Sequence, residues 1–146
     1  MPTKRSDVLI TLYQILEGSP ELCALVGHTP GANTIEDGAR ILADSVRIQG
    51  IEDHTMLILS FSDEPPSNRN RDTLLWNLEL WVYAPDIFAH ADILDALQRV
   101  CDEYQMDSSH PATINRLQWG GHQRITPQDI PTRLLVTRAV ITTTYI

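Results

Sequence analysis

The chain has 146 residues and a formal net charge of −8, from 11 basic and 19 acidic side chains. A chain of this length predicts a single domain, residues 1–146, that can bury a core without disulfide or metal support. Binding to nucleic acid or to an anionic membrane needs concentrated positive charge, so the acidic balance argues against both functions.

The N-terminal part predicts two short helices. Apolar residues recur at helical spacing over Val8–Leu16, behind a capping Ser6-Asp7 pair, and predict a helix to about Glu17. The run Ser19-Pro20-Glu21 is typical of a new helix start, because a capping serine precedes proline at the first helical position. We expect this second helix to end at Gly27.

Met1–Asp7 leads into the first helix without an apolar stretch, so we expect no export signal. No window approaches the ~18 apolar residues of a membrane-spanning helix. In a chain without an export signal, Cys23 and Cys101 are expected to be reduced and buried as small hydrophobic residues. A disulfide between them is the alternative.

The middle of the chain predicts strands separated by polar loops. His28–Gly38 has the composition of a loop, and Arg40–Gly50 fits either a strand or a short helical turn. His54–Ser62 is nearly all apolar and predicts a strand buried on both faces. Asp63–Asp72 has no apolar residue except its prolines and predicts a polar, mobile loop.

Thr73–Ala84 alternates regularly and predicts a strand with two different faces. One face carries Leu74, Trp76, Leu78, Leu80 and Val82, and the other carries Asn77, Glu79, Trp81 and Tyr83. The aromatic pair on the second face is either ordinary half-exposed surface or part of a protein interface.

Pro85-Asp86 begins the longest predicted helix, Ile87–Tyr104. A short strand that includes Trp119 follows it and is expected to end at Gly120-Gly121. The helix stripe consists of Phe88, Ala91, Leu94, Leu97, Cys101 and Tyr104, and we expect Ala91, Leu94, Leu97 and Cys101 to pack on the apolar face of Thr73–Ala84. A loop, Gln123–Pro131, leads to a last strand, Arg133–Ile146. The order predicts an α+β fold: an antiparallel or mixed sheet of about 4–5 strands, with the N-terminal helices and the long helix on one face.

The sequence contains no pattern typical of catalysis. His28, His54, His90, His110 and His122 have no metal-ligand spacing to another histidine, cysteine or carboxylate. The acidic residues of the long helix predict a solvated face, and no phosphate-binding glycine loop or nucleophile motif is present. We therefore expect no catalytic residue, no metal and no cofactor, and a protein that is not an enzyme.

The segments DVLITLYQILEG, SPELCALVG, MLILSFSD, LLWNLELWVYAPD, IFAHADILDALQRVCDEY and RLLVTRAVITTTYI follow one another in an order that resembles the tail-terminator or tail-completion proteins of long-tailed bacteriophages. The resemblance covers nearly the whole chain and lies in order and pattern. It implies a virion protein of the tail–neck junction, assembled in the host cytoplasm, that forms a hexameric ring. The ring would cap the tail tube and join it to the neck or head-completion protein.

An acidic lumen in such a ring would repel DNA phosphates, so DNA would pass through it without specific binding. For the interfaces we expect Asn68, Arg69 and Arg71 in the polar loop, and Trp81 and Tyr83 on the second face of their strand. Arginine suits such contacts because its fork binds carboxylates and carbonyls. The alternatives are a neck or head-completion protein, and a small α+β module that binds a ligand or a protein.

Overall fold

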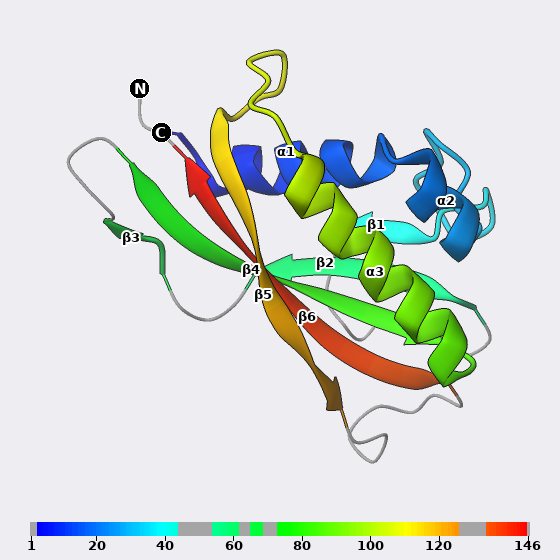
Figure 1. Cartoon of the computed structure of the whole chain (residues 1–146). Helices are drawn as coiled ribbons and strands as arrows, with labels where there is room; N and C mark the ends of the chain where they lie inside the picture. The colour runs from blue at the N-terminus through cyan, green and yellow to red at the C-terminus, as the bar shows by residue number, and fades with distance from the viewer. Residues whose placement is uncertain (1–2, 44–53, 62–64, 69–72, 126–133, 146) are drawn as a thin grey trace.

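The computed structural model describes residues 3–43, 54–61, 65–68, 73–125 and 134–145 (Figure 1). The helices within these residues are α1 (Arg5–Glu17), α2 (Pro20–Val26) and α3 (Ile87–Glu103). The strands are β1 (Ile41–Ala43), β2 (Met56–Phe61), β3 (Ser67–Asn68), β4 (Leu74–Ala84), β5 (Ile114–Ile125) and β6 (Leu135–Tyr145).

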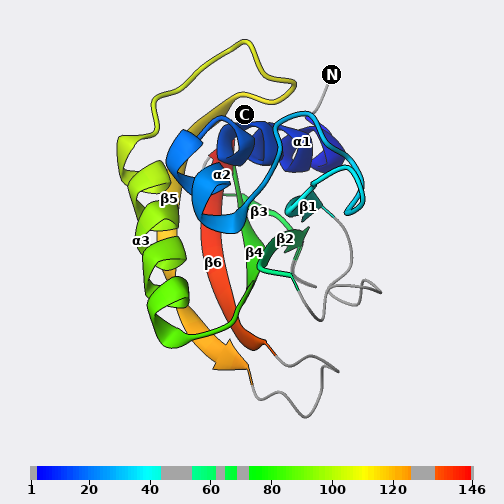
Figure 2. The ribbon, with the colours of Figure 1, turned by 90° about the vertical axis from the view of Figure 1, so that its right-hand side faces the viewer.

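The strands form one mixed sheet in the order β1-β2-β4-β6-β5, and β3 pairs with the start of β4. Strand β1 is parallel to β2, and all other pairs are antiparallel. Figure 2 shows this order from β5, beside α3, to β1 on the opposite side. The α+β prediction is confirmed. The ambiguous segment Arg40–Gly50 contributes a short parallel strand, and its residues 44–50 lie outside the described part.

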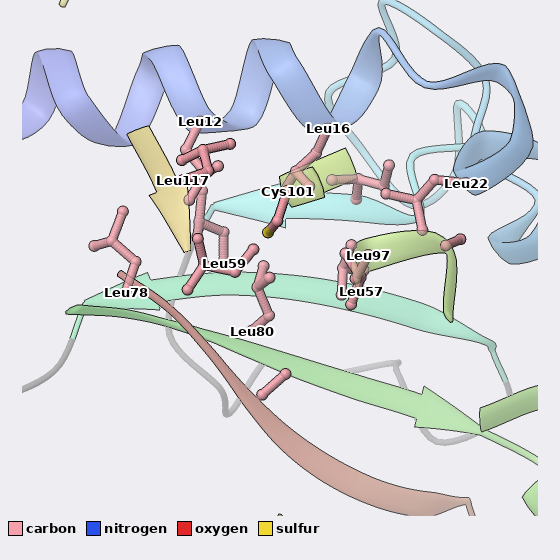
Figure 3. Close-up of a cluster of buried hydrophobic side chains, with 14 of the residues drawn as sticks. Leu12, Leu16, Leu22, Leu57, Leu59, Leu78, Leu80, Leu97, Cys101 and Leu117 are labelled. Carbon is pink, nitrogen blue, oxygen red and sulfur yellow. The ribbon is translucent and has the colours of Figure 1, made fainter. Parts of the chain in front are cut away.

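The main core lies between the three helices and one face of the sheet (Figure 3). The alternation predicted for β4 is confirmed, since Trp76, Leu78, Leu80 and Val82 are buried and Leu74 is half-buried. Leu12 and Leu16 of α1 and Leu22 of α2 are buried in the same core. Burial of each such side chain stabilises the fold by about 1.5–3 kcal/mol.

The observed ends of α2 match those predicted from the sequence, whereas the observed start of α1 does not. The Ser19 side chain accepts a hydrogen bond from the Leu22 backbone N–H, and Gly27 adopts a left-handed conformation with φ +74°. The expected Ser6-Asp7 cap is wrong. Helix α1 begins two residues earlier than Asp7, and its capping position is Lys4, which makes no side-chain cap bond. Asp7 then lies in the first turn, where a carboxylate favours the positive end of the helix dipole.

The buried stripe of α3 differs from the predicted one. Its buried residues are His90, Ile93, Ala96, Leu97 and Cys101. Phe88 is 76% exposed, Ala91 is exposed and Leu94 is half-buried. The prediction assigned the helix face by hydrophobicity alone, whereas a histidine that hydrogen-bonds to the strands beneath α3 occupies one buried position.

Strand β5 also continues further than predicted. Gly120 and Gly121 do not end it, because the register with β6 shifts between Trp119 and His122 and then resumes. Gly121 has φ +89°, as in a bulge that bends a strand. A Cβ on Gly120 would lie 3.0 Å from the Val140 carbonyl oxygen, so the two strands approach too closely there for a side chain.

Candidate interaction surface

The face of the sheet turned away from the helices is the candidate site. We call it the open face; its side chains are Asn77, Glu79 and Trp81 of β4, Arg138, Val140, Thr142 and Thr144 of β6, and Arg116, Gln118 and Gln123 of β5. All are half-buried or exposed. They lie here because the pleat places alternate residues of each strand on opposite faces, and the helices cover only one face.

Hydrogen bonds and an ion pair connect the polar side chains of the open face within and across its strands. The Thr142 hydroxyl donates to Asn77 Oδ1 at 2.7 Å, and Trp81 Nε1–H donates to Glu79 Oε2 at 3.2 Å. Arg138 Nη1 lies 3.7 Å from Glu79 Oε1, and Arg138 Nη2–H donates to Gln123 Oε1 at 3.3 Å. These contacts hold the side chains in fixed positions, which lowers the entropy cost of binding a partner.

Tyr83, predicted to share an interface with Trp81, is fully buried. It belongs to a second, smaller core with Met56, Ile58 and Val136, and Trp81 packs at the edge of this core. Burial raises the pKa of the Tyr83 hydroxyl to about 12. The prediction that Tyr83 contacts a partner directly at the surface is therefore wrong. Strand alternation identifies which residues share the second face, but it does not reveal which of them are buried. Trp81 is half-buried and accessible.

The polar loop Asp63–Asp72 contains a strand that the sequence did not predict. Ser67 and Asn68 form β3 and pair with Leu75 and Leu74, so the backbone of Asn68 extends the sheet as a hairpin at the start of β4 (Figure 1). Arg69 and Arg71 lie outside the described residues. The interface role of this hairpin stays a prediction.

Two of the five histidines are buried, and each uses both ring nitrogens. His28 Nδ1 accepts hydrogen bonds from the backbone N–H groups of Arg40 and Ile41, at 2.9 and 3.2 Å. Its Nε2–H therefore donates to Glu17 Oε2. His90 Nε2 donates to the Leu135 carbonyl at 2.8 Å. These rings hold the backbone in place and have no free nitrogen with which to bind a ligand.

Other candidate chemistry in the described part of the chain is sparse. No three histidine, cysteine or acidic side chains gather there as a metal site would require. Cys23 and Cys101 are free and buried, as expected, and burial raises the pKa of the Cys101 thiol to about 12. None of the described helices combines the length and the apolar character needed to cross a membrane.

Two open cavities flank the helical layer. One, of about 440 Å³, lies between α1 and β1 and is lined mainly by apolar side chains, including Leu9, Ile10 and Tyr13. The other, of about 380 Å³, lies between α3 and β5, where Ile87 and Leu94 face His122 and Arg124. In the first cavity the Tyr13 hydroxyl donates to Glu17 Oε2, but that oxygen also accepts from His28 and Gly31, so the contact belongs to a structural network.

No protein-family model and no curated protein matches the sequence. Among solved structures, the chain is similar to a chain from the virion of a native gene transfer agent particle. The two share 12% sequence identity with a TM-score of 0.55, and the match covers 92% of this chain and 91% of the other. At this identity the likeness shows a shared fold across nearly the whole domain.

Proposed function

We propose that this chain is a structural subunit of a phage-like virion, and within it the tail terminator: a hexameric ring that ends the tail tube and joins it to the neck. The observation that carries the proposal is the fold likeness, over 92% of the chain, to a chain of a gene transfer agent virion. The order of sequence segments, which resembles the tail-terminator family, supports the same role independently.

The arrangement of side chains fits a protein that binds other proteins. The buried histidines both act as backbone anchors, and the polar groups of the open face are spread along three strands instead of converging in one pocket. A broad polar face suits an assembly interface, which carries many hydrogen bonds over a large area. On this proposal the partners are further copies of the chain, the tail tube protein and the neck protein.

The mass of the purified protein tests the ring. Six copies of the 16.4 kDa chain give about 98 kDa, which light scattering coupled to size exclusion separates clearly from a monomer. We expect the larger species. A chain that remains at 16.4 kDa at micromolar concentration, alone and with tail tubes, would contradict the ring.

Particles produced without this chain test the position in the virion. A terminator should leave tails of uncontrolled length, because nothing stops tube growth. A neck or head-completion protein should leave tails of normal length that do not join heads. Electron microscopy of the particles distinguishes the two, and normal joined particles would contradict both.

A further inference from the structure

The helical and strand layers of the subunit carry opposite charge. Exposed carboxylates of α2 and α3 are Glu21, Asp92, Asp95, Asp102 and Glu103. The one basic side chain of these two helices, Arg99, is already paired with Glu21. Within β2, β4, β5 and β6 the balance is reversed, since three arginines, Arg116, Arg124 and Arg138, accompany one acid, Glu79. Among the described residues, the acidic excess of α2 and α3 thus lies apart from these four strands.

On the open face, two arginines, Arg116 and Arg138, accompany a single carboxylate, Glu79, so positive charge is in excess. Glu79 is shared between Trp81 and Arg138, and Arg116 is exposed on the outer strand. Arg138 Nε is enclosed and has no hydrogen-bond acceptor among the residues that the structure describes. Because this atom is enclosed, a partner cannot reach it. The donors that an acidic partner can reach belong to the exposed Arg116 side chain and to the exposed part of the Arg138 side chain, which is 37% exposed.

We infer that the partner is a second copy of the chain, whose acidic α3 surface docks on the open face. This inference rests on the proposed ring and names the two surfaces that form it. The carboxylates of α3 in one subunit would accept hydrogen bonds from Arg116 and Arg138 of the next, a geometry that arginine favours. The contact joins two different surfaces, and such head-to-tail contacts generate rings when the rotation closes.

The charges of the chain favour a second copy over nucleic acid as the partner of the open face. A DNA duplex carries a dense row of negative charge that a chain of net charge −8 repels as a whole. A second copy carries the same net charge, but its exposed carboxylates on α3 form a limited patch that arginines of the open face can pair with individually. Complementary charge on two patches also selects the register of the contact.

Reversing the charge of each surface tests the inference. A face variant carries Arg116→Glu and Gln118→Glu, and a helix variant carries Asp92→Lys and Asp95→Lys. All four positions are exposed, so both variants should fold. Each variant alone should need at least about tenfold more protein for half of the chains to assemble, because its interface now joins like charges.

An equimolar mixture of the two variants is the decisive measurement. The reversed face of one variant then meets the reversed helix of the other, and the two unaltered surfaces meet at the alternate contacts. The mixture should regain the wild-type mass by light scattering. The matched control for the face variant is Lys4→Glu with Ser6→Glu, at the start of α1. It changes the charge by −3, as the face variant does, and should assemble normally.

The outcomes separate this inference from the proposed function. A wild-type protein that stays monomeric contradicts the ring itself. A wild-type ring whose assembly is unaffected in both variants, or is lost in both and not regained in the mixture, overturns the inferred surfaces and leaves the ring intact. If the face variant assembles normally but loses retention of duplex DNA, the open face is a nucleic-acid surface and the inference is wrong.

Discussion

Glu17 Oε2, at the end of α1, accepts a hydrogen bond from His28 Nε2 at 2.7 Å, which joins α1 to the segment that leads into β1. The same oxygen accepts from the Tyr13 hydroxyl at 3.0 Å and from the Gly31 backbone N–H at 3.3 Å. Because His28 Nδ1 in turn accepts from the backbone of Arg40 and Ile41, one carboxylate organises the approach to the edge strand.

This network predicts acid-sensitive stability. Partial burial raises the pKa of the Glu17 carboxyl, but hydrogen bonds from His28, Tyr13 and Gly31 outweigh it and lower the pKa below its ordinary value. A lowered folded-state pKa stabilises the protein above the unfolded-state value, about 4.3, and this contribution disappears as pH falls through the folded-state value. Glu17→Gln should therefore flatten the fall in unfolding free energy below about pH 4.3.

Urea denaturation between pH 3 and pH 7 measures this dependence. Glu36→Gln, at an exposed position in the loop before β1, is the matched control and should keep the wild-type profile. If the profile of Glu17→Gln also matches the wild type, the network does not contribute to acid sensitivity.

His90 should be a stabilising residue. Its ring lies 2.8 Å from the Leu135 carbonyl and 3.1 Å from the Thr137 hydroxyl, so it joins α3 to the start of β6. His90→Ala leaves these buried groups without their partner and should cost about 1–3 kcal/mol in unfolding free energy. His122→Ala, at an exposed position of β5, should change stability by less than about 0.5 kcal/mol. Equal effects of the two substitutions would contradict the anchoring role.

Truncations along α3 test which face of the helix is buried. Leu97 is fully buried and Phe88 is 76% exposed. Leu97→Ala should cost about 2–5 kcal/mol, whereas Phe88→Ala should stay within about 0.5 kcal/mol. Leu94→Ala, at a half-buried position, should fall between them. Chemical denaturation gives the three values, and a large loss for Phe88→Ala would favour the stripe predicted from sequence.

The segment between β3 and β4 should contribute to assembly. Arg69→Ala with Arg71→Ala removes two side chains that the sequence places in a polar loop outside the core. The double variant should fold with wild-type stability but fail to form rings or to cap tails in a complementation assay. Lys4→Ala with Arg5→Ala, at the start of α1, removes the same charge as a control. Normal tail length in the double hairpin variant would make the loop an ordinary solvent-exposed turn.

Local chemistry in the sequence determined several features directly. The run Ser19-Pro20 and Gly27 delimit α2, because capping and left-handed conformations depend on the residue itself. The period-two pattern of Thr73–Ala84 identified the face of β4 that packs on the helices. Strand and helix order also determined the α+β class, since adjacent elements must bury their apolar faces against each other.

Only the tertiary structure decided which polar and aromatic residues are covered. His90 hydrogen-bonds to Leu135, 45 residues away, so no local pattern marks its position on α3 as buried. Tyr83 lies on the polar side of β4, yet it is fully buried in a cluster with Met56 and Val136, its partners on the two neighbouring strands. Periodicity determines which way a side chain points relative to its own strand. What lies in that direction depends on strands that the chain brings together only after folding.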